Sequence, residues 1–259
     1  MTDRIIARKE GPVGWLIFNN PERRNAISVD MWEAIPAVLS RYESDAEVRV
    51  IVLAGAGDKA FVSGADISQF EKERSSADAV QRYEELAEGA AARLQDCDKP
   101  LIAMVRGYCL GGGLNIAVLC DLRIASDDAR FGIPAAKMGL GYRASSMKNL
   151  VEVVGAANAR EIMLTARQFT AAEAREMGLV NQVTTKEGLD AAVREYCEMI
   201  SGNAPLTMRT AKRIIREIGR AGYDAAKCRA WAKECFESED YKEGRKAFME
   251  KRKPVFTGK

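Results

Sequence analysis

The sequence predicts an α/β fold with a helical C-terminal region. Short apolar runs alternate with helix-like stretches through the first three quarters of the 259 residues, which is typical of a parallel sheet with helices on its faces. The last quarter has helical periodicity and no apolar run of the strand type. No low-complexity linker or internal repeat is visible. We therefore expect an α/β core over residues 1–200 and a helical region over residues 201–259.

The expected strands are short and mostly apolar, as in a sheet that is buried on both faces. The first two cover residues 5–9 and 13–18, and Pro21 stops the second. We expect residues 55–64 to form a loop, because the stretch is rich in glycine and polar residues. The later strands are expected at residues 48–54, 101–105, 122–126 and 180–183.

The expected helices follow from the spacing of apolar residues and from capping signals. In the helix expected at 28–44, Ile35 and Val38 fall on one face, although Pro36 interrupts the pattern. The sequence Thr-Ala-Ala-Glu at 170–173 is a capping box, which predicts the start of a short helix. The other helices are expected at residues 76–95, 112–120, 147–154, 188–200, 205–218 and 223–249.

Charge and cysteine content exclude several classes of partner. Lys and Arg number 39 and Asp and Glu number 37, so the net charge of +2 supplies no general attraction to nucleic acid or to an anionic membrane. No run approaches the ~18 apolar residues of a membrane span, and the N-terminus does not have the pattern of a signal peptide. The six cysteines form no C-x-x-C pair, which favours reduced, buried thiols and a cytoplasmic location.

The chain contains no histidine, which restricts its chemistry. A Ser-His-Asp or Cys-His catalytic group is excluded within the chain, as is a zinc site of the histidine-containing kinds. We expect no metal centre. Any proton transfer must use a carboxyl group, tyrosine, lysine, cysteine, the backbone or water.

Two glycine-containing turns, each entered from an apolar strand, are the strongest candidates for chemistry. In the first, residues 107–114, three consecutive glycines begin a helix and leave backbone N–H groups unpaired, including that of Gly112. In the second, residues 59–67, Gly64 allows the N–H of Ala65 to be exposed. Two such N–H groups directed at one oxygen would form an oxyanion hole. The glycines could equally serve close packing of the helix on the sheet.

Short motifs spread in order over essentially the whole chain carry a resemblance to known proteins. They are Asn20-Pro21, Asn25-Ala26, Gly64-Ala65-Asp66-Ile67, Gly107-Tyr108, Gly111-Gly112-Gly113, Cys120-Asp121, Phe131-Gly132, Met177-Gly178-Leu179-Val180 and the ending from Glu250 to Gly258. Together they resemble the crotonase superfamily, the enoyl-CoA hydratase/isomerase family. The resemblance implies a crotonase-like spiral of βαβ units, a C-terminal helical oligomerisation region, and homo-oligomers that are trimers or hexamers. It also implies an acyl-CoA substrate, with coenzyme A as part of the substrate and no separate cofactor.

The resemblance also implies roles for individual residues. The N–H groups of Ala65 and Gly112 would hold the thioester oxygen. Phe248 and Lys251 fall where a neighbouring subunit often touches the adenine nucleotide. The segments that would line the coenzyme A channel contain Arg23, Arg24, Ala26, Gly64, Asp66 and Ile67. From the residues alone, the basic side chains could equally be solvated surface charges, and Asp66 could be a turn residue.

The sequence departs from the typical hydratases of this family at both glutamates. The position two residues after the triple glycine is Asn115, and the position after Phe-Gly-Ile-Pro is Ala135. Neither side chain can activate water or protonate carbon, so ordinary hydration is disfavoured. The same loss removes the base of the typical single-glutamate isomerases.

The loop at residues 139–146 supplies other polar groups near the expected acyl pocket, notably Tyr142 and Arg143. A tyrosine there resembles the methylmalonyl-CoA decarboxylase branch, whose partner histidine this chain lacks. Decarboxylation needs no base, because loss of CO2 itself creates an enolate that an oxyanion hole stabilises. Arg143 could clamp a carboxylate. Asn115, at the position of the first typical glutamate, is also a candidate site residue.

Two alternatives to a lyase or decarboxylase stay open. One is a hydratase or isomerase with relocated acids, and the other is an acyl-CoA-binding protein without catalysis. The candidate relocated acids are Glu71, Glu73, Glu84, Glu85 and Glu152.

Overall fold

The computed structural model describes the backbone of residues 2–66, 77–220 and 222–259, and the side chains of the same residues except 77–80. Its larger sheet contains the six predicted strands in the order β1-β2-β3-β5-β7-β10. β1 and β2 are antiparallel, and every later neighbour in this sheet is parallel. Their bounds are β1 Ile5–Glu10, β2 Val13–Phe18, β3 Val50–Gly55, β5 Leu101–Val105, β7 Leu122–Ser126 and β10 Gln182–Thr184.

A second sheet of very short strands lies beside the first, in the order β4-β6-β8-β9. β4 falls inside residues 55–64, so the expectation that this stretch is only a loop was wrong. Strands of two or three residues are too short to show an alternating pattern, which is why the sequence did not reveal them. Their bounds are β4 Ala60–Val62, β6 Tyr108–Leu110, β8 Arg130–Gly132 and β9 Phe169–Thr170.

The helices agree with the expected positions, with two corrections. The helix expected at 147–154 matches the first part of α5, which starts earlier, at Ala144, and is interrupted by a kink at Gly155 (φ +73°). The one expected at 223–249 is two helices, of which the second has Ser238 as its N-cap. Pro36 lies inside the first long helix without ending it. The bounds are α1 Val29–Ser44, α3 Ala77–Asp96, α4 Gly112–Leu119, α5 Ala144–Thr165, α6 Ala171–Glu176, α7 Leu189–Ser201, α8 Pro205–Ile218, α9 Ala225–Phe236 and α10 Glu239–Glu250; η1 Pro21–Arg23 and η2 Pro134–Met138 are 3-10 turns.

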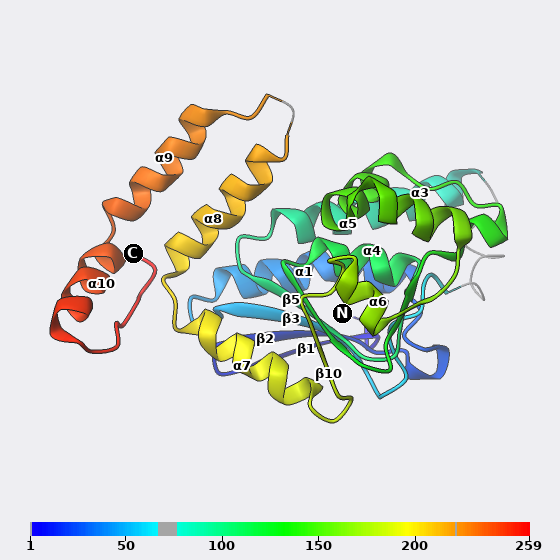
Figure 1. The fold of residues 1–259 in the computed structure, drawn as a ribbon, viewed down its shortest axis with the longest axis horizontal. Coiled ribbons are helices and arrows are strands. Elements are labelled where there is room, and N and C mark those ends of the chain that lie inside the picture. Colours follow the sequence, from blue (N-terminus) through cyan, green and yellow to red (C-terminus); the bar gives the residue numbers. More distant parts are fainter. Residues whose placement is uncertain (1, 67–76, 221) are drawn as a thin grey trace.

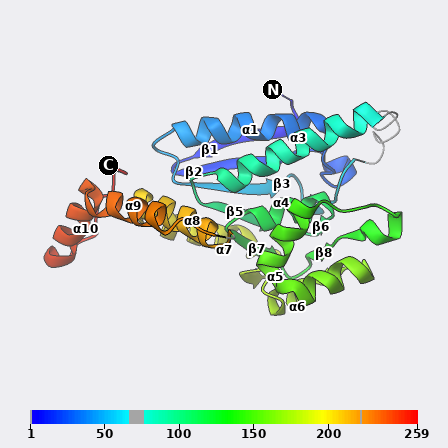
Figure 2. The ribbon, with the colours of Figure 1, turned by 90° about the horizontal axis from the view of Figure 1, so that it is seen from above.

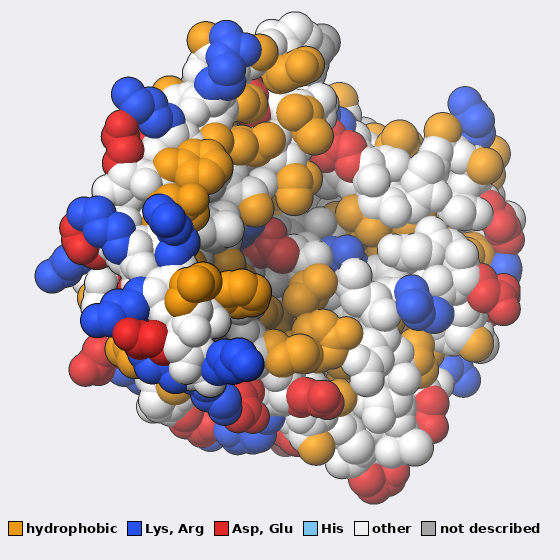
Figure 3. All heavy atoms as spheres, turned by 60° about the vertical axis from the view of Figure 1, so that its left-hand side comes forward, with side chains coloured by type: hydrophobic (Ala, Val, Ile, Leu, Met, Phe, Trp, Pro, Cys, Tyr) orange, Lys and Arg blue, Asp and Glu red, His pale blue; other side chains and the backbone are white. Residues whose placement is uncertain are grey.

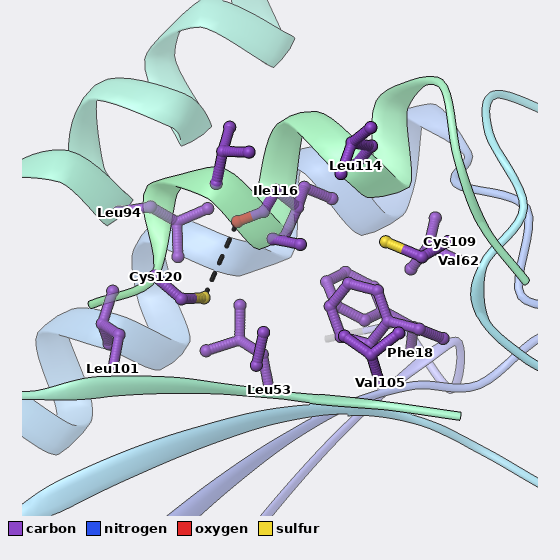
Figure 4. Packing of buried hydrophobic residues seen from close by; sticks show 14 of the residues in the cluster. Phe18, Leu53, Val62, Leu94, Leu101, Val105, Cys109, Leu114, Ile116 and Cys120 are labelled. Atoms are coloured by element: carbon purple, nitrogen blue, oxygen red, sulfur yellow. Dashed lines mark hydrogen bonds between the residues drawn. The ribbon is translucent and has the colours of Figure 1, made fainter. Parts of the chain in front are cut away.

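The sheet lies between two layers of helix, with α7 on one face and α1, α3 and α4 on the other (Figure 1). Alternate residues of β3 serve the two faces, as expected for strand geometry. Val50 and Val52 pack with α7, whereas Ile51 and Leu53 pack with the helices opposite. The latter cluster contains Phe18, Leu114 and Cys120, which point into one apolar space between β-strands and α4 (Figure 4). This core fixes the position of α4, and so of the glycine turn at its start.

The C-terminal helices lie apart from the sheet. α8, α9 and α10 project to one side of the core, and Figure 2 shows the same projection from above. Hydrophobic side chains gather on this face among basic and acidic ones (Figure 3), and Ile215, Phe236 and Phe248 are each more than half exposed. The predicted boundary between residues 200 and 201 stays a prediction. No helix in the described part of the chain is both long and apolar enough to cross a membrane.

Candidate active site

The two predicted turns meet at one wall of a cavity of about 420 Å³. Gly64 and Ala65 line it from the turn after β4, and Gly111 and Gly112 line it from the start of α4. A Cβ placed on Gly112 would lie 4.0 Å from the backbone nitrogen of Ala65. The two N–H groups that the sequence pointed to therefore lie close together in space. The volume is that of a small-molecule pocket.

Hydrogen bonds of Ile27 orient the N–H of Ala65. The Ile27 N–H donates to the Gly64 carbonyl (2.8 Å), and the Asp66 N–H donates to the Ile27 carbonyl (3.0 Å). In this parallel bridge the two residues flanking Ala65 bond to Ile27, so the N–H of Ala65 points the other way. Neither this N–H nor that of Gly112 donates to another residue that the structure describes. Two free donors at one wall are suited to binding a developing negative charge on oxygen.

The three consecutive glycines serve both packing and exposure of N–H groups. Gly111 has a φ of +52°, which favours glycine, and precedes the first helical residue. A Cβ on Gly113 would lie 2.0 Å from the Val62 carbonyl oxygen, so this glycine is needed for close approach of α4 to β4. At Gly112 a Cβ would meet nothing closer than 3.7 Å. Packing therefore explains Gly113, and it leaves the N–H of Gly112, at the start of the helix, available to a ligand.

A polar corner, formed by Asn115 and Tyr142, lies in the same cavity. Asn115, one turn along α4 from Gly112, and Tyr142, just before α5, both line it. The Asn115 Oδ1 atom and the Tyr142 hydroxyl are buried, and neither has a hydrogen-bond partner among the described residues. Burial raises the pKa of Tyr142 to about 12, although the nearby Asn115 amide opposes the shift. The phenol is therefore a neutral donor at physiological pH, and buried polar groups of this kind call for a polar ligand.

The residue at the expected position of the second glutamate is Ala135. It lies in η2, is 3% exposed and lines the cavity. Glu88 is the one carboxylate among the described residues that line this cavity, and the sequence analysis missed it. Glu88 and Tyr83 lie on the face of α3 that also carries Ala91, Ala92 and Gln95. Helical spacing was the available signal, but it could not show that this face of α3 borders a ligand pocket.

Arg143 connects the loop before α5 to α3 across the rim of the cavity. Its Nη1 donates to the Glu84 carbonyl (3.2 Å) and lies 3.6 Å from Glu88 Oε1. The guanidinium is thus already bound on one side while it lines the cavity. Of the other acids considered, Glu152 borders a different cavity, Glu84 and Glu85 are not among the lining residues, and Glu71 and Glu73 lie outside the described residues.

The segment predicted to line the coenzyme A channel is bonded to the Gly64 turn. The Ser63 N–H donates to the Arg24 carbonyl (3.1 Å), and the Arg24 guanidinium lies 4.9 Å from the centre of the Tyr108 ring. Ala26 is buried beside this turn. Arg23, Asp66 and Arg24 do not border the cavity itself, and Ile67 lies outside the described residues.

Phe248 and Lys251 lie in the projecting helices. Phe248 is on α10 and is 83% exposed, and Lys251 follows as the C-cap of the same helix. Neither lines the cavity of its own chain. Their contact with coenzyme A on a neighbouring subunit stays a prediction.

Known proteins match the chain over its whole length. The sequence pattern of the enoyl-CoA hydratase/isomerase family matches residues 8–259. A short-chain-enoyl-CoA hydratase of Clostridium acetobutylicum is 37% identical, over 97% of this chain and 96% of that protein. A peroxisomal Delta(3,5)-Delta(2,4)-dienoyl-CoA isomerase of Arabidopsis thaliana is 35% identical, over 97% and 95%.

The chain belongs to the enoyl-CoA hydratase/isomerase family.

Solved structures of the family agree with the fold. A crystal structure of an enoyl-CoA hydratase/carnithine racemase from Magnetospirillum magneticum superposes with a TM-score of 0.94 at 33% identity, over 100% of this chain and 97% of that one. A family protein from Hyphomonas neptunium gives 0.95 at 34%, over 99% and 98%. The predicted crotonase-like fold is therefore confirmed, and with it the acyl-CoA class of the family.

Proposed function

We propose that the protein converts an acyl-CoA through a thioester enolate held by the N–H groups of Ala65 and Gly112, and that the step is decarboxylation or a related lyase reaction. The observation that carries the proposal is the polar corner beside those donors. There the Tyr142 hydroxyl, which can donate, is buried without a hydrogen-bond partner among the described residues. A carboxylate on the α-carbon would accept a hydrogen bond from Tyr142 and another from the amide nitrogen of Asn115.

The proposed reaction is balanced without a base. The bond between the α-carbon and its carboxylate breaks, and CO2 leaves. The electron pair of that bond forms the enolate, whose negative oxygen is stabilised by the two N–H groups. The α-carbon then takes a proton from the Tyr142 phenol, which regains one from water. The neutral phenol, with a pKa of about 12, is suited to give its proton to a carbanion.

Hydration or isomerisation with a relocated acid is the second candidate. Glu88 supports it, because its carboxylate borders the cavity. The names of the hydratase and isomerase relatives support it as well. In this second candidate function, Glu88 would give up its ion pair with Arg143 and would activate water or shuttle a proton. An acyl-CoA-binding protein without turnover is the third candidate.

Measurements on a panel of substrates distinguish the three candidate functions. We expect methylmalonyl-CoA or another α-carboxyacyl-CoA to release CO2, and crotonyl-CoA to keep its conjugated absorbance. Loss of that absorbance at a catalytic rate would contradict the proposal and favour Glu88. Binding of the whole panel, measured by calorimetry, without turnover of any member would favour the binding protein.

The helices α8–α10 support assembly of identical subunits. Their exposed side chains include Ile215, Ile218, Phe248 and Met249, each more than half exposed, which is unusual for a surface that faces only water. A second copy of the chain is the simplest cover for them. We expect light scattering coupled to size exclusion to give the mass of a trimer or hexamer, and a monomer would contradict this.

A further inference from the structure

The helix α4 begins with the donor Gly112 but has no charged residue of its own. Its sequence is Gly-Gly-Leu-Asn-Ile-Ala-Val-Leu, with no acid in the first turn and no base in the last. The last carbonyls of a helix have no partners within it, and together they carry a partial negative charge of about half a unit. A group that binds these carbonyls therefore affects the position of α4 and also the electrostatic potential at its Gly112 end.

Arg123, on β7, binds the C-terminal end of α4. Its Nη1 lies 2.5 Å from the Cys120 carbonyl oxygen and 3.4 Å from that of Ala117, and its Nε donates to the Leu179 carbonyl (2.6 Å). The residue is 6% exposed, and it is the one buried lysine or arginine among the side chains that the structure describes. A single guanidinium thus joins the end of α4 to the turn that follows α6.

The sheet holds the backbone of Arg123 in place. Its N–H donates to Asn181 Oδ1 (2.8 Å), and its carbonyl accepts from the Asn181 N–H (2.8 Å). β7 is also paired with β5 and β10 on its two sides. Because the N–H donors of a guanidinium lie in a planar fork, the side chain binds carbonyls of two segments in one fixed geometry. The contact therefore fixes where α4 ends relative to the sheet.

The positive charge of Arg123 is not neutralised by an ion pair in the described part of the chain. Asp121 is close enough to favour the charged guanidinium, but its carboxylate is bound by Lys212 (2.6 Å) and by the Leu101 N–H (2.7 Å). The charges of Asp121 and Lys212 sum to zero, so the charge of Arg123 remains. Burial lowers the pKa of the Arg123 guanidinium, yet an arginine stays protonated in a protein.

This charge acts on the Gly112 end through the length of α4. The helix has eight residues and rises about 12 Å. A cation beside the C-terminal carbonyls offsets their partial negative charge, so the potential at the Gly112 N–H becomes more positive. With an effective dielectric constant of about 20, one charge at about 12 Å from an enolate oxygen corresponds to roughly a tenfold change in rate.

We propose that Arg123 is a positioning residue for the oxyanion hole: by binding the C-terminal carbonyls of α4, it sets the place and the donor strength of the Gly112 N–H. Arg123 does not border the cavity, so it acts on the substrate only through the helix. The inference rests on the oxyanion hole of the proposed function, and it does not depend on which reaction the enolate enters.

Infrared difference spectra of a bound thioester test the inference without turnover. The probe is butanoyl-CoA with ¹³C at its carbonyl carbon, which has neither an α-carboxylate to lose nor a double bond to hydrate. Hydrogen bonds in an oxyanion hole polarise the carbonyl group and lower its stretching frequency. We expect the largest lowering in the wild-type protein, a smaller one in Arg123→Lys, which keeps the charge without the fork, and the smallest in Arg123→Met. The spectrum reports only molecules that bind the probe, so it is independent of the folded fraction.

Kinetics and binding give a second measurement. On the accepted acyl-CoA, kcat should fall about tenfold in Arg123→Met with little change in KM. Coenzyme A alone, which has no carbonyl group for the oxyanion hole, should bind both variants with the wild-type Kd. A residue that served stability alone would change neither the carbonyl frequency nor the kcat of the folded molecules.

Tyr42→Phe is the matched control for a lost buried hydrogen bond. The Tyr42 hydroxyl, on α1, donates to the Trp15 carbonyl (2.7 Å), and Tyr42 does not border the cavity. This variant should lose stability and keep the wild-type carbonyl frequency. A loss of the shift as large as in Arg123→Met would show a general effect of destabilisation and would overturn the inference.

Two other results distinguish failure of this inference from failure of the proposed function. The full wild-type shift in Arg123→Met, or in Arg123→Lys where the methionine variant does not fold, would overturn the role of Arg123 and leave the oxyanion hole intact. The same frequency for the free probe and the probe bound to the wild-type protein would overturn the oxyanion hole itself.

Discussion

Gly112 and Ala65 approach each other across the gap between two turns, since a Cβ on Gly112 would lie 4.0 Å from the Ala65 nitrogen. Each residue follows a glycine with positive φ, Gly111 and Gly64, which directs the chain into the turn. The relationship places two backbone donors at one wall of the cavity, and substitution by proline removes such a donor.

Removing the Gly112 donor should abolish catalysis. Gly112 is the first residue of α4, a position where proline is tolerated, so Gly112→Pro deletes the N–H at modest cost to the helix. We expect its kcat to fall about 10²–10³-fold more than that of Gly112→Ala, which keeps the N–H and makes only ordinary contacts. Steady-state kinetics on the accepted acyl-CoA would measure this, with circular dichroism as the check on folding. Equal activity of the two variants would rule out the oxyanion hole.

Removing the Tyr142 hydroxyl should impair the reaction more than binding. Tyr142→Phe keeps the ring in the cavity and deletes a hydroxyl that has no partner among the described residues. We expect kcat for the α-carboxyacyl-CoA to fall about 10²-fold, the lower range for a lost proton donor, with a smaller change in KM. Tyr241→Phe, on α10 and outside the cavity, is the control. An unchanged kcat in Tyr142→Phe would exclude Tyr142 as the proton donor.

The titration of Tyr142 should lie far above neutrality. Burial raises its pKa to about 12, compared with about 10 for a free phenol. The folded chain therefore holds this proton more tightly than the unfolded chain, so its contribution to stability is complete below about pH 10 and is lost as pH rises toward about 12. We expect the phenolate absorbance difference between wild type and Tyr142→Phe to appear only above about pH 11, at the foot of that titration. A step centred near pH 10 would show a solvated phenol.

Glu88→Gln distinguishes the two leading reactions. For decarboxylation we expect less than about a fivefold change in kcat/KM, because only the 3.6 Å contact with Arg143 is lost. If Glu88 were the acid or base of hydration, the loss on crotonyl-CoA would be about 10²–10⁴-fold. Rates on both substrates, with Glu85→Gln as a control outside the cavity lining, provide the measurement.

Gly113 should be far less tolerant than its neighbour. A Cβ at Gly113 would lie 2.0 Å from the Val62 carbonyl, so Gly113→Ala must push α4 away from β4. We expect the free energy of unfolding to fall by about 3 kcal/mol or more. Gly112→Ala should change it by less than about 1 kcal/mol, because its nearest new contact is 3.7 Å. Urea denaturation of both variants gives the comparison, and similar losses would contradict the packing described for α4.

The sequence by itself determined the order of the main strands and helices, because long apolar patterns and capping residues are local signals. It also indicated the two glycine-containing turns. The prediction that both typical glutamates are missing came from the sequence as well, since Asn115 and Ala135 can be read directly from the motifs. Only the tertiary structure decided which groups share the cavity. The short strands β4 and β6 carry too few residues for a pattern, and they bring Ala65 to Gly112. Glu88 became a candidate only when α3, α4 and α5 packed together, because contacts between distant segments depend on packing that no local pattern encodes.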